Sequence, residues 1–198
     1  MKYVLATANP GKVEEMREIL SDLKIEVVSR KELGIDIDVD ETGTTFSENA
    51  KLKAEAICLV TGLPSIADDS GLIVDALGGE PGLYSSSYGG AELTSNERCE
   101  YLLDKMRSIK QRSAKFVSII VCAFPDGAIL EACGECEGSI AYEMHGTRGF
   151  GYDPVFIPKG LVKTMAQISA EEKNKLSHRG KALRNFTKLL KSYNEGID

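Results

Sequence analysis

The sequence predicts an α/β fold, because apolar segments typical of strands alternate with segments whose apolar residues recur at helical spacing. Lys2–Ala6 has the composition of a buried strand, and residues 13–23 follow it with the spacing of an amphipathic helix. Further along, residues 115–124 form a nearly continuous apolar run. It leads through Asp126-Gly127, a strong turn signal, into another strand at residues 129–136. These two strands are expected to be the longest pair of the sheet.

Length and composition indicate an ordinary globular protein. The chain has 198 residues without a repeat or linker, so residues 1–198 are expected to form a single domain. A net charge of −6 disfavours a protein that binds nucleic acid through many phosphate contacts, although it permits a small anionic ligand. The N-terminal apolar run is too short for a signal peptide, and no segment is long enough to cross a bilayer. We therefore expect a cytoplasmic protein without a membrane partner.

The motif Cys133-Gly134-Glu135-Cys136 is a CxxC, which raises the question of a metal or redox site. No second CxxC or histidine pair completes a zinc site. The segment alternates like a strand, and an offset of three residues places the two sulfurs on opposite faces. We interpret these cysteines as structural thiols.

A candidate phosphate-binding turn follows the first strand, at Thr7-Ala8-Asn9-Pro10-Gly11-Lys12. Asn9 is a favourable N-cap, and Pro10 suits the first position of a helix. The N-terminus of a helix offers free N–H groups and a partial positive charge, and Lys12 adds a full charge, so this end suits phosphate. The turn is not a Walker loop, because the GxxxxGK[ST] spacing is absent. The alternative is a capped turn with a structural role alone.

Two adjacent carboxylates, Asp68-Asp69, follow the apolar residues Ile66-Ala67. We expect a turn at residues 68–71 between two strands, the second of which is Leu72–Leu77. Carboxylates at a strand end are suitable ligands for Mg²⁺, which takes one or two of them together with substrate phosphates. The alternative is that the pair only caps a tight turn.

Residues 45–48, Thr-Phe-Ser-Glu, have the form of a capping box and predict a helix to about Val60. Asn49 and Lys53 lie one turn apart on this helix and share a face. That face is either an exposed polar stripe or the means by which Lys53 reaches the carboxylate pair. Glu41, in the acidic stretch before the helix, is a candidate for a further metal ligand.

Further candidates lie in the C-terminal quarter. Residues 146–154 form a glycine-rich loop that carries Phe150 and Tyr152, and glycines beside an aromatic ring let the backbone approach a flat ligand closely. The alternative is a packed aromatic corner. Another capping box predicts a short helix carrying Lys173, and residues 177–180 are expected to precede the last helix.

Together these motifs resemble those of the inosine triphosphate pyrophosphatase-like family, which acts on non-standard purine nucleoside triphosphates. The resemblance covers nearly the whole chain and rests on five separated motifs in the family's order. They are the phosphate loop Thr7–Lys12, the segment Glu41-Thr42-Gly43 with Asn49 and Lys53, the metal motif and turn at Ile66–Tyr84, the base-binding Phe150–Asp153, and Lys173 with Ser177–Gly180. One such motif would be a weak signal, but five in register are a strong one.

The resemblance implies an α/β fold with a long, bent mixed β-sheet, whose flanking helices form two lobes around a nucleotide cleft. It also implies a homodimer that hydrolyses ITP, dITP and XTP to the monophosphate and pyrophosphate with Mg²⁺. Asp69 and Glu41 would hold the metal, Lys53 would contribute to catalysis, and Asp69 or Asp68 would orient or deprotonate the water. The sequence leaves open which carboxylate has which role.

The family's other functional positions carry over as substrate-binding residues. They are Thr7, Ala8, Asn9, Pro10, Gly11, Lys12, Ser70, Phe150, Gly151, Tyr152, Asp153, Lys173, His178 and Arg179. Among them, Lys12 and Lys173 are expected to supply positive charge to the phosphates.

The base is expected to be read by stacking and by hydrogen bonds. Phe150 (or Tyr152) would stack on the purine, while the backbone near Phe150, with His178 and Arg179, would donate hydrogen bonds to its polar edge. A donor that faces position 6 of the purine can bind a carbonyl oxygen there, but it cannot bind the amino group of adenine. A donor that faces position 2 disfavours guanine, which has an amino group at that position. The alternative is that His178 and Arg179 cap the last helix or bind phosphate.

Two positions depart from the family pattern. Ala8 stands where glycine is frequent, and Ser87 stands where an arginine is expected before Tyr88. Two other functions remain as alternatives. A Maf-like pyrophosphatase of different specificity is disfavoured by the FGYD and SHRG segments, and a non-catalytic nucleotide-binding protein is disfavoured by the joint presence of the charged residues assigned to metal and phosphate.

Overall fold

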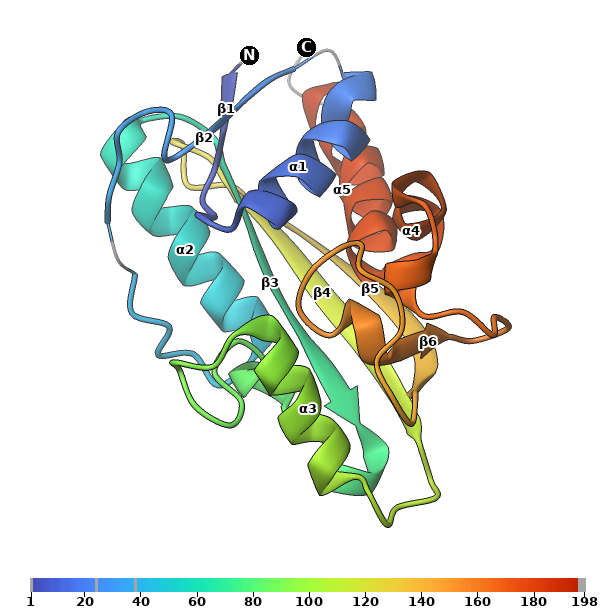
Figure 1. Ribbon diagram of the computed structural model, residues 1–198. Helices are drawn as coiled ribbons and strands as arrows, with labels where there is room; N and C mark the ends of the chain where they lie inside the picture. Colours follow the sequence, from blue (N-terminus) through green and yellow to red (C-terminus); the bar gives the residue numbers. More distant parts are fainter. Residues whose placement is uncertain (1, 24, 38, 196–198) are drawn as a thin grey trace. The chain divides into compact units, whose positions relative to one another are not determined.

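The strands and helices of the computed structural model, which describes residues 2–23, 25–37 and 39–195, form a mixed α/β fold (Figure 1). The described residues contain a six-stranded sheet in the order β2-β1-β3-β4-β5-β6. The strand bounds are Lys2–Leu5 (β1), Glu26–Ser29 (β2), Ser65–Val74 (β3), Ser113–Ala123 (β4), Ile129–Ile140 (β5) and Phe156–Pro158 (β6). β1 pairs in parallel with β2 and β3, whereas β5 and β6 are antiparallel. The expected α/β class and mixed sheet are therefore confirmed, and β4 and β5 are the longest of the described strands.

The described helices begin where their capping residues predict, except the last one. Their bounds are Pro10–Leu20 (α1), Phe46–Thr61 (α2), Ser95–Lys105 (α3), Ala170–Leu176 (α4) and His178–Glu195 (α5). The side chain of Asn9 accepts a hydrogen bond from Lys12 N at 3.1 Å, and Pro10 takes the first position of α1. The capping box before α4 forms as expected. None of the described helices is long and apolar enough to cross a membrane.

The contacts within the chain divide it into two compact units. Unit 1 consists of Met1–Asp69, Ser118–Gly134 and Arg179–Asp198, and unit 2 of Ser70–Val117 and Glu135–His178. β3, β4 and β5 contribute residues to both units. The prediction of a single domain, like those of the bent sheet and the cleft, stays a prediction.

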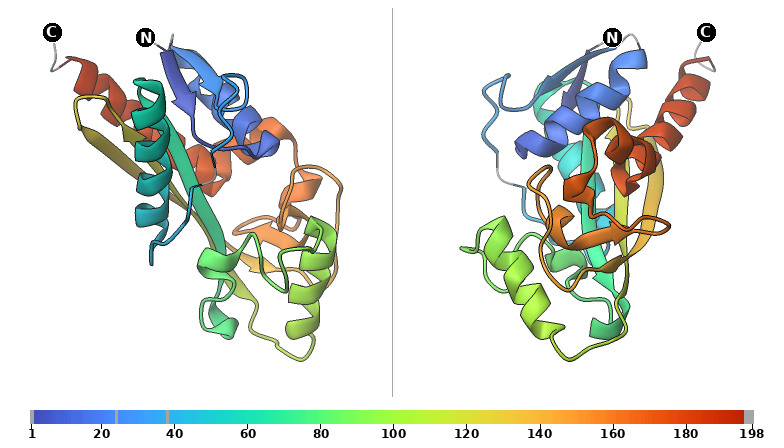
Figure 2. Two further views of the ribbon diagram at one scale, coloured as in Figure 1. Left: turned by 90° about the vertical axis from the view of Figure 1, so that its left-hand side faces the viewer. Right: turned by 45° about the vertical axis from the view of Figure 1, so that its right-hand side comes forward.

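The core of unit 1 joins the first strand to the last helix. It includes Tyr3, Leu5, Met16, Leu20, Ile66, Ile120, Leu183, Phe186 and Leu190. These residues place α1 and α5 against the same apolar cluster, while α2 lies on the opposite face of the strands from α5 (Figure 2). Each fully buried aliphatic or aromatic side chain contributes about 1.5–3 kcal/mol to stability, so this cluster holds the site-bearing ends of α1 and α5 in place.

The core of unit 2 gathers the end of β3, the inner face of α3 and the segment around β6. It includes Leu72, Val74, Cys99, Leu102, Met106, Phe116, Val155, Phe156 and Met165. Arg112 joins the end of β5 to the residue after α3, because its Nε donates a hydrogen bond to Ile140 O and its Nη1 donates one to Met106 O, both at 2.9 Å.

The expected turn at residues 68–71 is wrong, because β3 runs without interruption from Ser65 to Val74. The Asp-Ser-Gly signal is local, whereas β3 is an inner strand of the sheet that pairs with β1 at Ser65 and Ile66 and has β4 as its other neighbour. Tertiary pairing of this kind overrides local preference. The expected second strand also ends earlier, because residues 75–77 form a 3₁₀ turn.

One capping box and one helix start also differ from expectation. Glu48 does not close the box with Thr45, because its carboxylate accepts hydrogen bonds from the N–H and hydroxyl of Thr44 at 2.6 and 2.9 Å. The last helix begins at His178, so residues 178–180 lie in its first turn and do not precede it. Ser177 alone is extended between α4 and α5, and one such residue is enough to separate two helices.

The two cysteines of the CxxC motif lie on opposite faces of β5, as predicted. Cys136 is buried and Cys133 is exposed, in agreement with the alternation along the strand.

Candidate active site

The two carboxylates of β3 have different surroundings in unit 1. Successive side chains of a strand point to opposite faces. Asp68 therefore meets residues of α1 and α5, whereas Asp69 meets Lys53 of α2. The sequence pair is thus divided between two sets of partners.

Asp68 is enclosed by cations and a hydroxyl. Its side chain is 0% exposed, and its Oδ2 lies 2.7 Å from Lys12 Nζ and 3.0 Å from Arg179 Nη2. Its Oδ1 accepts a hydrogen bond from Ser118 Oγ at 2.5 Å. Burial alone would raise the pKa of Asp68, but the charges of Arg179 and Lys12 and the hydrogen bonds from Lys12 and Ser118 hold it far below its usual range. Asp68 is therefore an ionised anchor for two cations, with no access to a reacting water.

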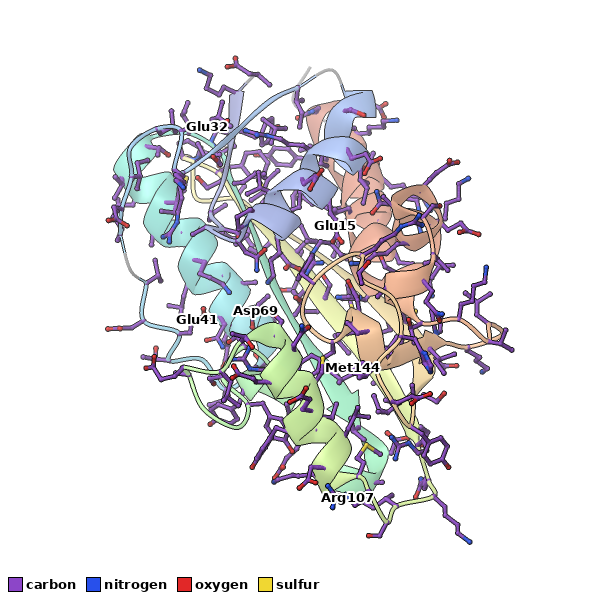
Figure 3. The ribbon with its side chains drawn as sticks, viewed as in Figure 1. Glu15, Glu32, Glu41, Asp69, Arg107 and Met144 are labelled. Carbon is purple, nitrogen blue, oxygen red and sulfur yellow. The ribbon has the colours of Figure 1, made fainter. Side chains whose placement is uncertain are left out.

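The buried guanidinium group of Arg179 forms salt bridges with two carboxylates. Besides Asp68 it binds Glu15 of α1, whose Oε2 lies 2.6 Å from Nη1. Although burial acts in the opposite direction, these two carboxylates raise the pKa of Arg179. The geometry ties the first turn of α5 to α1, beside the phosphate loop (Glu15 is labelled in Figure 3).

The phosphate loop has the local structure of a capped strand-to-helix turn. Thr7 Oγ1 accepts a hydrogen bond from Asn9 N at 3.2 Å, and residues 8–10 are exposed. Lys12 Nζ also lies 3.5 Å from the carbonyl oxygen of Asp68. Burial lowers the pKa of Lys12 and Asp68 opposes that effect, so the ammonium is held by Asp68 at the N-terminal end of α1.

Asp69 belongs to a second, more open cluster. Its Oδ1 accepts a hydrogen bond from Lys53 Nζ at 2.7 Å, and the same Nζ lies 3.5 Å from Glu41 Oε2. Both carboxylates lie beside α2 (Figure 3). The expectation that Lys53 reaches the carboxylates is confirmed. Burial raises the pKa of Asp69, and the charge and hydrogen bond of Lys53 offset only part of that effect. Asp69 thus has the electrostatics of a proton acceptor.

The loop that carries Glu41 is anchored to α2 through a close approach at Gly43. Its N–H donates to Asn49 Oδ1 at 2.8 Å, and a Cβ at this position would lie 2.6 Å from the same oxygen. Asn49 is buried. On the shared face of α2, Asn49 therefore fixes the loop that carries Glu41, and Lys53 supplies the ammonium group that contacts Asp69.

The donor set of Glu41 and Asp69 fits a hard divalent cation. Two carboxylate oxygens from separate segments converge on the same ammonium nitrogen, and oxygen ligands suit Mg²⁺. Within the described residues, no group of three or more His, Cys, Asp or Glu side chains could hold a metal. Remaining ligands would therefore have to come from substrate phosphates and water, as is usual for Mg²⁺.

The predicted base-binding loop lies in unit 2 and is closed by an ion pair. Asp153 Oδ2 accepts from the N–H of Phe150 at 2.9 Å and forms a buried salt bridge with Lys173 of α4. Lys173 Nζ also lies 4.6 Å from the centroid of the Phe150 ring. A Cβ at Gly149, which has a φ of 74°, would lie 2.0 Å from Asp153 Oδ2. Lys173 thus contacts the aromatic loop, although sequence reasoning had given it to the phosphates.

The two aromatic residues of this loop differ in exposure. Tyr152 is 5% exposed and its hydroxyl donates to Ser85 O at 3.0 Å, whereas Phe150 is only partly buried. Gly151 O accepts a hydrogen bond from the Cys99 thiol. Phe150 is therefore the better placed of the two to stack on a ligand.

The remaining predicted residues lie in unit 2 near its boundaries in the sequence. His178 is buried and stacks on Phe116, with ring centroids 4.5 Å apart and an interplanar angle of 11°. Ser70 is partly buried and follows Asp69 on β3.

Sequence reasoning missed two residues of the Asp68 cluster and one of the base loop. Ser118 had a weak signal, because it is a lone hydroxyl within the apolar run of β4. Glu15 had none, since it resembles any polar residue of α1. Ser85 joins the base loop to β3, because its Oγ accepts from Leu72 N at 2.9 Å while its carbonyl accepts from Tyr152.

A capped helix end beside Lys12, and two carboxylates that contact one ammonium group, are features suited to phosphate and to a divalent cation. The chain belongs to the Ham1 family, whose model matches residues 3–189. This confirms the family membership expected from the five motifs.

The similar proteins agree with one another in description. A dITP/XTP pyrophosphatase of Thermus thermophilus is 48% identical over 99% of this chain and 93% of its own length. A dITP/XTP pyrophosphatase of Bacillus subtilis is 44% identical over 96% of each chain. The solved structure of a HAM1 protein from Coxiella burnetii superposes with a TM-score of 0.88 at 40% identity, covering 97% of this chain and 99% of that one.

Proposed function

We propose that this protein hydrolyses the non-canonical purine nucleoside triphosphates ITP, dITP and XTP to the monophosphate and pyrophosphate, and so clears them from the nucleotide pool. The observation that carries the proposal is the contrast between Asp68, anchored among cations, and Asp69, held in the open cluster with Lys53 and Glu41. One carboxylate organises phosphate-binding charge and its neighbour is available for chemistry. The descriptions of the relatives from Thermus thermophilus and Bacillus subtilis support the same substrate class.

The reaction requires a water molecule to add to the α-phosphorus while the phosphoanhydride bond between the α- and β-phosphates breaks. Asp69 accepts the proton of that water, because its raised pKa makes it a better base than an ordinary aspartate. Pyrophosphate leaves with the bridging oxygen. Asp68 cannot share this role, since it is fully enclosed and its pKa is held low.

Asp69 and Glu41 would hold Mg²⁺. When bound, the metal would neutralise charge on phosphate oxygens and increase the acidity of a bound water.

The triphosphate would bind to residues of unit 1. The exposed turn formed by residues 8–10 and the N–H groups that begin α1 suit phosphate oxygens. Lys12 and Lys53 add positive charge that stabilises a transferring phosphoryl group. Ser70 is proposed as a further substrate contact because it directly follows Asp69.

The purine would be recognised by residues 150–153, with the ring of Phe150 as the stacking surface. The ion pair of Asp153 with Lys173 would keep that ring in position. His178 and Arg179 stay candidates for reading the polar edge of the base. The alternative for Arg179, phosphate binding, is favoured by its contacts with Asp68 and Glu15 in the cluster that also holds Lys12.

Arg179→Ala tests these two roles. If Arg179 reads the base, the ratio of kcat/KM for ITP to that for GTP should fall in the variant. An unchanged ratio with a raised KM for both nucleotides would assign Arg179 to the phosphates.

The proposed function is tested by measuring pyrophosphate release from a panel of nucleoside triphosphates with and without Mg²⁺. We expect rapid hydrolysis of ITP, dITP and XTP, slow hydrolysis of ATP and GTP, and little activity without metal. Preference for pyrimidine or modified nucleotides would favour the Maf-like alternative. Binding without turnover would favour a non-catalytic nucleotide-binding protein.

The homodimer and the cytoplasmic location are also proposals, based on the family resemblance. Sedimentation of the purified protein tests the first, and localisation of a tagged chain in the cell tests the second.

A further inference from the structure

Lys53 occupies the position between the two proposed metal ligands. Its Nζ is 2.7 Å from Asp69 Oδ1 and 3.5 Å from Glu41 Oε2. The three groups come from separate places in unit 1, namely α2, β3 and the loop before α2. Among the described residues, no other ammonium lies within 4 Å of either carboxylate, and Lys12 is engaged by Asp68.

An ammonium and a divalent cation cannot both lie between these oxygens. Two ionised carboxylates carry two negative charges, of which Lys53 balances one and a divalent cation would balance both. Like charges at such short separation in a partly buried site repel strongly. Entry of the metal therefore requires Lys53 to move.

A displaced ammonium needs another anion. The triphosphate of the proposed substrate would provide one, because phosphoryl-transfer sites place lysines on non-bridging phosphate oxygens. Glu41 is half-exposed and Lys53 ends a flexible four-carbon stem, so the exchange needs no change in the backbone.

We propose that Lys53 is an exchangeable occupant of the cation site, which makes binding of the metal and of the nucleotide depend on each other. Without nucleotide the ammonium neutralises Asp69 and Glu41 and competes with the metal. With nucleotide it moves to the phosphates, and the vacated oxygens bind the metal. The proposal rests on the proposed function in taking Glu41 and Asp69 as the metal ligands.

Competition is tested by measuring Mn²⁺ binding to the nucleotide-free protein by electron paramagnetic resonance. Lys53→Met keeps the length of the side chain and removes its charge, so we expect Mn²⁺ to bind about tenfold more tightly, which corresponds to ~1.4 kcal/mol. Lys51→Met is the matched control, because Lys51 lies on the same helix but pairs with Glu55 at 3.8 Å. This control should change the affinity by less than threefold.

Coupling is tested by repeating the titration with a non-hydrolysable ITP analogue. In the wild type the analogue should tighten Mn²⁺ binding by a larger factor than in Lys53→Met, because only the wild type has an ammonium to transfer. By linkage, Mn²⁺ should tighten analogue binding by the same factor. Lys53→Gln, checked for cooperative unfolding, serves as a second variant if Lys53→Met does not fold.

Failure of this proposal can be distinguished from failure of the metal assignment. Equal or weaker Mn²⁺ affinity in Lys53→Met, or an equal effect of the analogue in both proteins, overturns the exchange. Mn²⁺ binding that is unaffected by Asp69→Asn overturns the metal assignment in the proposed function and the exchange with it. Tighter binding in Lys53→Met that also requires Asp69 supports both.

Discussion

Two lysine–aspartate ion pairs, one in each unit, differ in how completely they are enclosed. Lys173 and Asp153 in unit 2 have side chains that are 8% and 4% exposed, and Asp153 also accepts the N–H of Phe150. Lys53 and Asp69 in unit 1 are 14% and 11% exposed, but they share their site with Glu41, which is 50% exposed. The first pair is closed by the loop it holds, whereas the second has an open side.

The difference indicates what each pair is for. A closed pair in which every partner is engaged fixes a backbone, here the loop that carries Phe150. An open pair with a third, half-exposed carboxylate can exchange its cation and receive a ligand. Residue type alone does not distinguish the two, since both are a helical lysine facing an aspartate.

The largest effect is expected from Asp69→Asn. Removing the proton acceptor of the open pair should lower kcat by about 10²–10⁴-fold, the usual contribution of a general base. Steady-state pyrophosphate release measures it, with Asp75→Asn, an exposed position just beyond β3, as the control. A folded Asp69→Asn protein with near-normal turnover would remove Asp69 from the chemistry.

The next largest effect is on stability and should separate the two lysines. Lys173→Met leaves Asp153 buried without its cation and should lower the free energy of unfolding by about 3–5 kcal/mol. Lys53→Met should cost less than Lys173→Met, because Glu41 is 50% exposed and Asp69 is more exposed than Asp153. Urea denaturation measures both. Equal losses would mean that the pairs do not differ as their exposure indicates.

The pH dependence of activity should identify Asp69. A base must be ionised, so kcat/KM should fall as the pH decreases through the pKa of Asp69, which burial raises above its usual value. Since the charge of Lys53 lowers this pKa, Lys53→Met should move the acidic limb to higher pH. The profile of kcat/KM from pH 4 to 8 tests this. An acidic limb that does not move in Lys53→Met would mean that another group titrates.

The smallest effect is expected from Ser118→Ala in the Asp68 cluster. It removes one of the hydrogen bonds to a buried carboxylate, which should cost about 1–3 kcal/mol of stability. Because the pKa of Asp68 is lowered, its contribution to stability is present above the unfolded-state pKa of about 4 and is lost as the pH falls toward the folded-state value. Urea denaturation at pH 7, where the contribution of Asp68 is fully present, should therefore show the whole loss. An unchanged free energy of unfolding at that pH would exclude Ser118 from holding Asp68.

Features encoded within a few residues were predictable from the sequence. The start of α1 needs only Asn9 and Pro10, and the box before α4 needs only residues 169–172, so local hydrogen bonds determine both. The hairpin of β4 and β5 was predicted from the apolar run at residues 115–124 and the turn signal Asp126-Gly127. The reach of Lys53 to the carboxylates was offered as one of two interpretations.

Features that depend on distant segments were not predictable. β3 passes straight through Asp68–Gly71 as an inner strand of the sheet next to β4, and no local pattern reports that position. The separate roles of the adjacent aspartates depend on Ser118 and Arg179, which lie 50 and 111 residues from Asp68 in the sequence. The pairing of Lys173 with Asp153, 20 residues away in the sequence, was not predictable either, and the expected contact of Lys173 with the phosphates stays a prediction.

Because β3 is uninterrupted, the different surroundings of its two aspartates follow from the alternation of side chains between the two faces of the strand. Inserting or deleting one residue ahead of Asp68 would turn each carboxylate to the other side of the strand. The residue meant for the reacting water would then lie among Arg179 and Lys12, and the anchor would face Lys53. A change of two residues would restore the order while shifting it along the sheet. Length changes in the loop between α2 and β3 are therefore expected to be tolerated only where the strand keeps its phase.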